Sequence, residues 1–325
     1  MPPTQHSPAL PRKPLIVRLR NYIGDVVLTL PSLDRLHAAG YDLHLVGKPW
    51  LKSLLDAYPW SKTTYPKSIG QRRRVLATLA DELTQVDSGF GQRINAVTFP
   101  TSFSSALEMR LAGLRGFGFA AEARSLLLAG RAKIVYGEHA LDSYWRLTSS
   151  LLKDNTPPPH ASSFRISAAA DNELRAAFRQ AGVTGKYIVL VPFAGGTFEK
   201  LDKKWAGFPA LAEKLRAQGH QLLMAPGPDE LSEASANFPG VVQIAKLGLG
   251  AYAAMMRDAQ LTIANDTGPG HMAASVDGNL LSVLGPTKIE QWGARGRNVT
   301  ILKSYPEWPS VDAVFDATRA SLASP

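Results

Sequence analysis

Apolar residues in the first half of the chain form short runs that alternate with amphipathic stretches. Runs with the length of a buried strand stand at 15–19, 43–46 and 96–99. Stretches in which an apolar residue returns every three or four positions predict helices at 26–36, 72–86 and 104–114. The first half is therefore predicted to alternate strand and helix.

The second half repeats this alternation more regularly. Strands are predicted at 187–192, 222–225, 241–244, 261–264 and 280–284, and helices at 206–218, 230–237, 251–258, 271–276 and 311–322. Such alternation is typical of parallel sheets covered by helices, here present twice. Ligands of these sheets bind at the carboxyl ends of the strands, so we expect a site in the cleft between two α/β domains.

A proline-rich break separates the two halves. Residues 154–163 read DNTPPPHASS, and three consecutive prolines favour the stiff polyproline II conformation of a linker. The predicted division is a disordered lead at 1–14, a first domain at 15–153, a linker at 154–170, a second domain at 171–305 and a terminal segment at 306–325.

Composition narrows the chemistry. The 325 residues include no cysteine, which excludes a disulfide scaffold, a thiol nucleophile and a cysteine-bound metal. No apolar run approaches the ~18 residues of a membrane-spanning helix, and the lead lacks the apolar core of a signal peptide, so we expect a cytoplasmic protein. Lys and Arg number 36 against 27 Asp and Glu, which favours phosphates, acidic sugars or an anionic membrane as partners. Nucleic acid is disfavoured because no basic stripe carries interleaved aromatic residues.

The segment 265–271 (NDTGPGH) follows a predicted strand and opens a predicted helix. Small residues there let backbone N–H groups approach an anion, which the helix dipole also attracts. Thr267 and His271 add donors, whereas Asp266 would bind a sugar hydroxyl or orient a neighbour. Asp, Thr and Gly are equally typical of a plain helix cap, so the pattern alone leaves both interpretations open.

Glycines and charged residues follow other strands at the same sheet edge. Gly195, Gly196 and Thr197, with Lys203 beyond them, suit a second phosphate contact, although a solvated basic loop has the same composition. Lys203 is two residues before a tryptophan, in the sequence KKW. Because this loop and the segment 265–271 would share one edge, the phosphate interpretation gains weight.

Carboxylates follow two further strands. Asp25, after Gly24, could be a general base or a helix cap, and the helix dipole would keep it ionised. Glu230 or its neighbour Asp229 could accept bonds from ribose hydroxyls or an adenine amino group, or could belong to a plain turn. No Walker A, G-x-S-x-G or H-E-x-x-H motif occurs, and the scattered histidines predict no metal site. A G-x-G-x-x-A match at 248–253 is weak support for a nicotinamide site.

Taken together, these segments resemble glycosyltransferase family 9, the ADP-heptose:lipopolysaccharide heptosyltransferases, from about residue 15 to residue 320. The most specific segment is NDTGPGHMAASVDGNLLSVLGPTKIEQWG (265–293). The others are IGDVVLTLPSLDRL (23–36), SALEMRLAGLRGFGF (105–119) and FAGGTFEKLDKKW (193–205).

The resemblance implies a GT-B architecture, in which two Rossmann-like domains face each other across a cleft and the terminal helix crosses back to the first domain. Family members transfer heptose from ADP-heptose, with inversion, to the inner core of lipopolysaccharide, without a catalytic metal or other cofactor. The implied acceptor is an acidic, lipid-linked Kdo or heptose, reached by peripheral contact with the inner face of the inner membrane.

The resemblance also assigns roles. Asp25 matches the aspartate proposed as general base, and Lys203 the lysine that meets the donor phosphates, with Gly195, Gly196 and Thr197 in the same loop. Glu230 matches the acid that binds the nucleoside, a role that Asp229 could also fill. The remaining donor-binding positions are Asp266, Thr267, Gly268 and His271, and a basic stretch towards the acceptor matches Arg72, Arg73 and Arg74.

Three positions depart from the family pattern. Gly270 stands where a bulkier residue or serine is frequent, residues 198–202 change the loop before Lys203, and Tyr22 replaces a small hydroxyl residue on the acceptor side. The alternatives are therefore a GT-B transferase or epimerase that uses another nucleotide sugar, and a non-catalytic protein that binds a nucleotide sugar or an anionic glycan.

Overall fold

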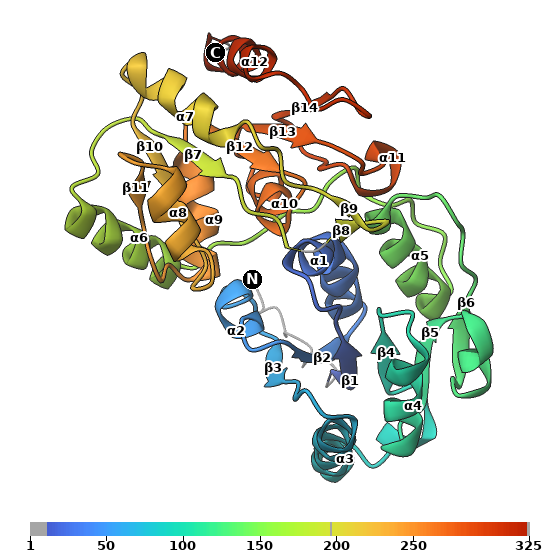
Figure 1. The fold of residues 1–325 in the computed structure, drawn as a ribbon. Coiled ribbons are helices and arrows are strands. Elements are labelled where there is room, and N and C mark those ends of the chain that lie inside the picture. The colour runs from blue at the N-terminus through green and yellow to red at the C-terminus, as the bar shows by residue number, and fades with distance from the viewer. Residues whose placement is uncertain (1–11, 196, 324–325) are drawn as a thin grey trace, which may run out of the picture.

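The structure is a computed structural model that describes residues 12–195 and 197–323. It contains two six-stranded sheets, both parallel throughout, with helices on their faces (Figure 1). The prediction of two parallel α/β units is confirmed. Of the lead expected at 1–14, residues 1–11 lie outside the described residues, and Lys13 and Pro14 belong to the first strand.

The first sheet has the strand order β3-β2-β1-β4-β5-β6. Its strands are β1 (Lys13–Arg18), β2 (Tyr41–Gly47), β3 (Ser61–Thr64), β4 (Ala96–Thr98), β5 (Gly116–Phe119) and β6 (Gly130–Ala132). The central strand β1 is buried from Pro14 onward, as expected for a parallel strand that helices cover on both faces. Beyond its carboxyl end the chain comes to the surface, where Asn21 and Tyr22 are exposed.

Five α-helices belong to this domain. They are α1 (Ile23–Ala38), α2 (Leu51–Leu54), α3 (Ile69–Val86), α4 (Phe103–Leu111) and α5 (Ala140–Leu152), with short 3-10 turns η1 (Phe90–Gln92) and η2 (Glu122–Leu126). Helix α5, which the sequence analysis did not predict, packs on α1. Its residue Tyr144 thereby lies close to the beginning of α1.

The second sheet has the order β11-β10-β7-β12-β13-β14. Its strands are β7 (Ile188–Val191), β10 (Leu222–Met224), β11 (Val242–Gln243), β12 (Leu261–Asn265), β13 (Leu280–Leu284) and β14 (Val299–Lys303), and a hairpin of β8 (Thr197–Phe198) and β9 (Leu201–Asp202) follows β7. Its helices are α6 (Ala168–Ala181), α7 (Phe208–Ala217), α8 (Leu231–Asn237), α9 (Leu249–Asp258), α10 (Gly268–Ser275), α11 (Ile289–Trp292) and α12 (Val311–Ala323).

The segment after α5 ties the domains together. The Phe164 N–H donates to the Ser275 carbonyl at 2.8 Å, and Arg165 pairs with Asp34 of α1, also at 2.8 Å. The Oγ of Ser167, which caps α6, donates to Asp56 of the first domain at 2.5 Å. These contacts hold residues 164–167, which lead into the second domain, against both domains.

The terminal helix corrects one expectation. We expected the segment 306–325 to cross back to the first domain, but α12 packs on α7 and on β12 and β13 of the second sheet (Figure 1). Val314 and Thr318 are fully buried there, and Lys214 of α7 pairs with Asp312. The apolar face of this helix is thus satisfied within the second domain.

Candidate functional site

A cavity of about 690 Å³ opens between the two domains. Its walls come from the loops that follow the carboxyl ends of β1 in the first sheet and of β7, β10 and β12 in the second. This is the edge at which parallel α/β sheets bind ligands. Of the site residues expected from the sequence, Asp25, Gly195, Lys203, Glu230, Asp266, Thr267, Gly268 and His271 line it.

The beginnings of α1 and α10, one from each domain, meet at the floor of this cavity. A Cβ atom placed on Gly24 would lie 2.8 Å from Cδ2 of His271 and 3.3 Å from Cα of Gly268. A Cβ atom on Gly268 would lie 3.0 Å from the Gly24 backbone nitrogen. Only glycine fits at both positions. The N-termini of α1 and α10, which carry the positive ends of the helix dipoles, therefore lie close together.

Asp25 lies in the first turn of α1 and is 6% exposed. The N-cap of this helix is Tyr22, and it has no side-chain cap hydrogen bond, so Asp25 is not the helix cap. Tyr144 of α5 donates its hydroxyl to Oδ1 of Asp25, and Nε of Arg20 lies 3.1 Å from the same oxygen. The hydrogen bond from Tyr144 and the ion pair with Arg20 both fall on one carboxylate oxygen, and the other oxygen has no hydrogen bond to a described residue.

Burial and nearby charge set the protonation of Tyr144 and Arg20, the two side chains that contact Asp25. Burial, and then the charge of Asp25, raise the pKa of Tyr144 well above its ordinary value, so its hydroxyl remains a donor. Burial alone would lower the pKa of Arg20, but Tyr144 and Asp25 outweigh it and the pKa is raised. Arg20 therefore stays cationic beside the carboxylate.

His271 lies on α10, on the opposite wall. Burial lowers its pKa, although Asp266 and Asp25 oppose the shift, so the ring is neutral at pH 7. Its Nδ1 is buried and has no hydrogen-bond partner among the described residues. The same holds for the hydroxyl of Thr267, which occupies the N-cap of α10 without capping it. Unpaired polar atoms in a buried wall indicate a place where a ligand binds.

A hydrogen-bonded chain positions the lysine of this site. Lys203 Nζ lies 2.9 Å from Oδ2 of Asp266, and the Thr287 hydroxyl donates to the same oxygen at 2.7 Å. The Asn265 side chain ties this loop to the end of β7, because it donates to the Pro192 carbonyl at 2.5 Å and accepts from the Trp205 N–H at 3.0 Å. Asp266 therefore orients a neighbouring cation, one of the two roles expected for it.

One part of the cavity wall is an apolar slot. Met224, Leu249 and Tyr252 form its walls, and burial raises the pKa of Tyr252. Glu230 lines it and accepts the Gly227 N–H through Oε2 at 2.7 Å. Asp229 is exposed and does not line the cavity, so the structure favours Glu230 over its neighbour.

Two residues of the predicted glycine loop are not among those that line the cavity. Gly196 lies outside the described residues, and Thr197 is described only as the first residue of β8. Phe198 and Glu199 of the adjoining hairpin do line the cavity.

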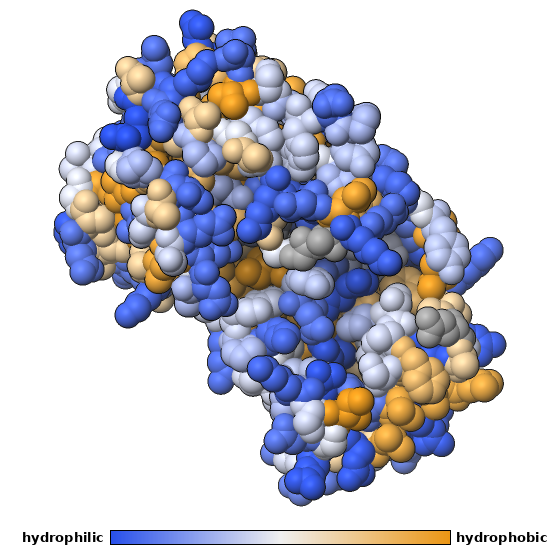
Figure 2. Space-filling view, in the orientation of Figure 1, coloured by the Kyte–Doolittle hydropathy of each residue, from blue (hydrophilic) through white to orange (hydrophobic). Residues whose placement is uncertain are grey.

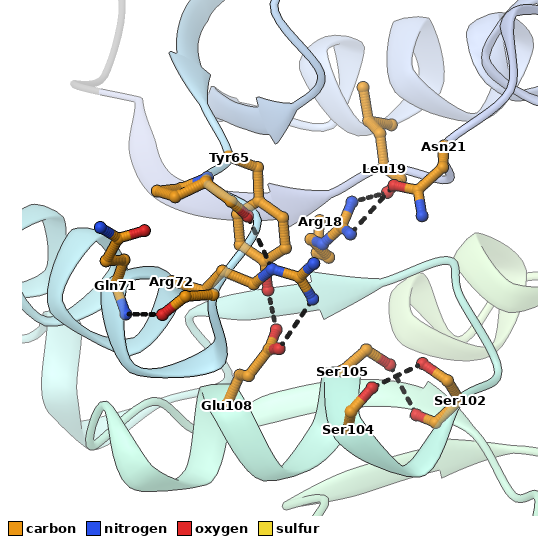
Figure 3. A network of polar contacts seen from close by, with 12 residues as sticks. Arg18, Leu19, Asn21, Tyr65, Gln71, Arg72, Ser102, Ser104, Ser105 and Glu108 are labelled. Atoms are coloured by element: carbon orange, nitrogen blue, oxygen red, sulfur yellow. Dashed lines mark hydrogen bonds and ion pairs between the residues drawn. The ribbon is translucent and has the colours of Figure 1, made fainter.

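The arginines expected at the acceptor side are not in the cavity wall. Arg73 and Arg74 are exposed on α3, whereas Arg72 lies 3.1 Å from Oε1 of Glu108, which is 1% exposed. Tyr65 donates to the same carboxylate, and the Arg18 guanidinium stacks 3.8 Å from the centre of the Tyr65 ring (Figure 3). Arg72 thus serves a buried network that joins α3, α4 and the end of β1.

Among the residues that the structure describes, no three His, Asp or Glu side chains gather as metal ligands. In the same part of the chain, no helix has the length and hydropathy needed to cross a membrane.

Two Rossmann-like domains that direct helix N-termini and cationic side chains into one cleft define a glycosyltransferase of GT-B architecture. A family model described as glycosyltransferase family 9 (heptosyltransferase) matches residues 94–318. The chain belongs to this family.

Relatives of known structure support the fold. Heptosyltransferase II of Escherichia coli is 18% identical, covers 95% of this chain and 98% of its own, and superposes with a TM-score of 0.77. Escherichia coli heptosyltransferase WaaC with ADP is 20% identical over 94% of this chain and 99% of its own, with a TM-score of 0.69.

A relative found by sequence matches part of the chain. Lipopolysaccharide heptosyltransferase 3 of Escherichia coli is 29% identical over 154 residues, so the match spans 44% of this chain and 45% of that protein.

Proposed function

We propose that this transferase moves heptose from ADP-heptose, with inversion, to an acidic lipid-linked sugar of the lipopolysaccharide inner core. The observation that carries the proposal is the cavity lined by a buried carboxylate of one domain and by the N-terminus of helix α10 of the other. Related solved enzymes contain ADP and ADP-2-deoxy-2-fluoro heptose, which supports this class of donor.

The second domain would hold the donor. The N-terminus of α10, with Thr267, Gly268 and the Lys203 ammonium, suits a diphosphate because N–H groups, a hydroxyl and a cation converge there. The slot beside Tyr252 suits the adenine ring, and Glu230 suits the ribose hydroxyls. The Asp266–Lys203 pair keeps the lysine in place before any phosphate arrives.

The first domain would supply the base. Asp25 takes the proton of an acceptor hydroxyl through its second carboxylate oxygen. The hydroxyl oxygen bonds to the anomeric carbon as the bond from that carbon to the diphosphate breaks, which inverts the configuration. ADP leaves with the bonding electrons, and Lys203, His271 and the α10 N–H groups would stabilise the charge that develops on it.

Arg20 would face the acceptor beside the base. Arg20 lines the wall beside Asp25 and is 30% exposed, so its free N–H groups could pair with an acidic acceptor. Arg72–Arg74 would act further out on the first domain, since none of them reaches the cavity. A lipid-linked acceptor would bring the protein to the inner face of the inner membrane.

Calorimetry with ADP-heptose and turnover with an inner-core acceptor test this assignment. Lys203→Ala should weaken donor binding and should lower kcat about 100-fold, as expected when one donor that stabilises the developing charge is lost. The adjacent Lys204→Ala is the matched control, because Lys204 is exposed and pairs only with Glu233, at 3.7 Å. Asp25→Asn should bind ADP-heptose normally yet lose turnover. UDP-GlcNAc bound in preference to ADP-heptose would overturn the donor, and normal turnover by Asp25→Asn would overturn the base.

A further inference from the structure

Helix α9 of the second domain begins against side chains of two other helices. The Leu249 N–H donates to Oγ of Ser53 at 2.9 Å, and Ser53 belongs to α2 of the first domain. The Gly248 N–H donates to Oε1 of Glu173 of α6 at 2.7 Å. The first N–H groups of a helix have no acceptor within it, and Gly248, at the N-cap, has no side chain to supply one. The first turn of α9 is therefore capped from outside, in part by the other domain.

Two glycines let the domains approach at this helix end. Helix α2 packs on α9, and the molecular surface is continuous between the domains there (Figure 1, Figure 2). A Cβ atom on Gly248 would lie 3.0 Å from Oγ of Ser53, and one on Gly250 would lie 3.1 Å from Oδ1 of Asp56. These are the glycines of the G-x-G-x-x-A match in the sequence. The carboxylates of Glu173 and Asp56 beside them would repel a pyrophosphate, so the match serves the packing of the domains rather than a nicotinamide cofactor.

Helix α9 also carries two walls of the apolar slot. Leu249, whose N–H meets Ser53, lines the cavity, and so does Tyr252 three residues later. The Tyr252 N–H donates to the Gly248 carbonyl at 2.8 Å, which closes the first turn of the helix. Both side chains are therefore fixed by the turn that the cap holds. Trp50, at the start of α2, lines the same cavity.

We propose that Ser53 is a positioning residue for the nucleotide: its hydroxyl, from the first domain, holds the first turn of α9 so that the slot exists before the donor arrives. The inference rests on the proposed function, which assigns the slot to adenine. It deepens that function, because the domain that carries the base then contributes to donor affinity through a side chain that does not touch the donor. Ser53 is not among the described residues that line the cavity.

Hydrogen exchange of the full chain without nucleotide tests the cap itself. In Ser53→Ala the Leu249 N–H loses its acceptor, so exchange over residues 249–252 should become about fivefold faster, the factor that one helix cap supplies. Ser53→Thr keeps a hydroxyl and should exchange as the wild type does. The matched control is Ser68→Ala, because Ser68 caps α3 within the first domain by accepting the Gln71 N–H at 3.3 Å. It should leave exchange over 249–252 unchanged.

Calorimetry with ADP and steady-state kinetics test the role in nucleotide binding. Ser53→Ala should weaken ADP binding about fivefold, because ADP must then order the turn that the hydroxyl no longer holds. The KM for ADP-heptose should rise by the same factor, while kcat at saturating donor stays unchanged because the base is untouched. Ser53→Thr should restore both values, and Ser68→Ala should match the wild type. A merely structural role for Ser53 would lower kcat and would not separate it from KM.

Three results would overturn the positioning role and leave the proposed function intact. They are unchanged exchange over 249–252 in Ser53→Ala, ADP binding by Ser53→Ala equal to that of the wild type, and a fall in kcat with no change in KM. Failure of the wild type to bind ADP would instead contradict the proposed donor, and the exchange result would then still decide whether Ser53 caps α9.

Discussion

At the scale of single residues, the proposed base depends on Tyr144 and Arg20, which contact the same oxygen of Asp25. Tyr144→Phe removes the hydroxyl that holds Oδ1 of Asp25 while keeping the ring that packs on Phe99. A hydrogen bond to a charged group contributes about 1.5–3 kcal/mol, so kcat should fall about 10- to 100-fold. Donor affinity should not change, because Tyr144 does not line the cavity.

Steady-state kinetics and donor calorimetry check this expectation. Tyr187→Phe is the control, since Tyr187 is also buried and donates to the Met255 carbonyl at 2.9 Å, within the second domain. A Tyr144→Phe enzyme with an unchanged kcat would show that Tyr144 does not position the base.

The residues at strand ends could be predicted, whereas their partners could not. Asp25, Lys203, Glu230 and His271 each follow a strand that the hydrophobic pattern indicates, and parallel strands bring such positions to one edge. Tyr144 is 119 residues away from Asp25 and reaches it only because α5 packs on α1. A contact of this kind has no local signal in one sequence.

At the scale of elements, α5 shows how a helix escapes prediction and yet serves the site. It begins after His139, whose Nδ1 accepts the Leu141 N–H, and histidine is not among the residues that commonly signal a helix start. The other ring nitrogen, Nε2, lies 2.9 Å from the Gly293 carbonyl of the second domain and must carry the proton. Three residues on, Asp142 pairs with Arg295. Helix α5 therefore joins the base to the second domain.

His139 should make stability depend on pH. Burial lowers its pKa to about 4, whereas in the unfolded chain it has the ordinary value of 6.5. Between these values the unfolded state binds a proton that the folded state does not, so the free energy of unfolding falls as the pH falls. The loss should be on the order of 3 kcal/mol by pH 4.

Urea unfolding at pH 7.5 and at pH 5 measures this loss. His139→Gln keeps an amide donor for Gly293 but does not titrate, so it should lose less stability between the two pH values than the wild type. His160→Gln, at an exposed histidine, should behave as the wild type. Equal losses in all three proteins would exclude His139 as the cause.

Both edge strands of the first sheet also escaped prediction. Strand β3 reads SKTT and β6 reads GRA, and neither is an apolar run. Edge strands are covered on fewer sides than central ones, so their burial imposes little pattern on the sequence. The central strands β1, β7, β12 and β13, which are buried along nearly their whole length, were all predicted.

At the scale of the whole molecule, the glycine pair on α1 and α10 is a place where the two domains pack closely. Gly268→Ala would place a Cβ atom 2.9 Å from Cβ of Ile23 and 3.0 Å from the Gly24 nitrogen, so the helix ends must separate. A misplacement of about 1 Å between reacting groups can cost ~100-fold in rate, and we expect a fall of that size in kcat.

Single-turnover rates and thermal unfolding separate this effect from misfolding. The melting temperature of Gly268→Ala should change little compared with the rate, since the contact lies at the domain junction and not in a core. Gly91→Ala, where a Cβ atom would meet nothing within 4 Å, is the control for an added methyl group. Wild-type turnover by Gly268→Ala would show that the spacing of the two helices does not set the rate.

The terminal helix α12 shows that a hydrophobic pattern can predict an apolar face without predicting which domain packs on it. Its amphipathic sequence predicts one apolar face, and that face exists, with Val314 fully buried. The pattern does not say which domain covers the face. Helix α7 and the neighbouring strands of the second sheet cover it, and the resemblance that placed it on the first domain was wrong on this point.

The glycine pair also limits how this enzyme can be recombined. Positions 24 and 268 belong to different domains, yet they share one van der Waals contact that leaves no room for a side chain on either. A hybrid built from this first domain and a foreign second domain inherits half of that contact. The two domains of the hybrid can pack in the same way only if the foreign domain also has glycine at the position of Gly268. Domains of this kind can therefore be exchanged only between proteins that keep both glycines.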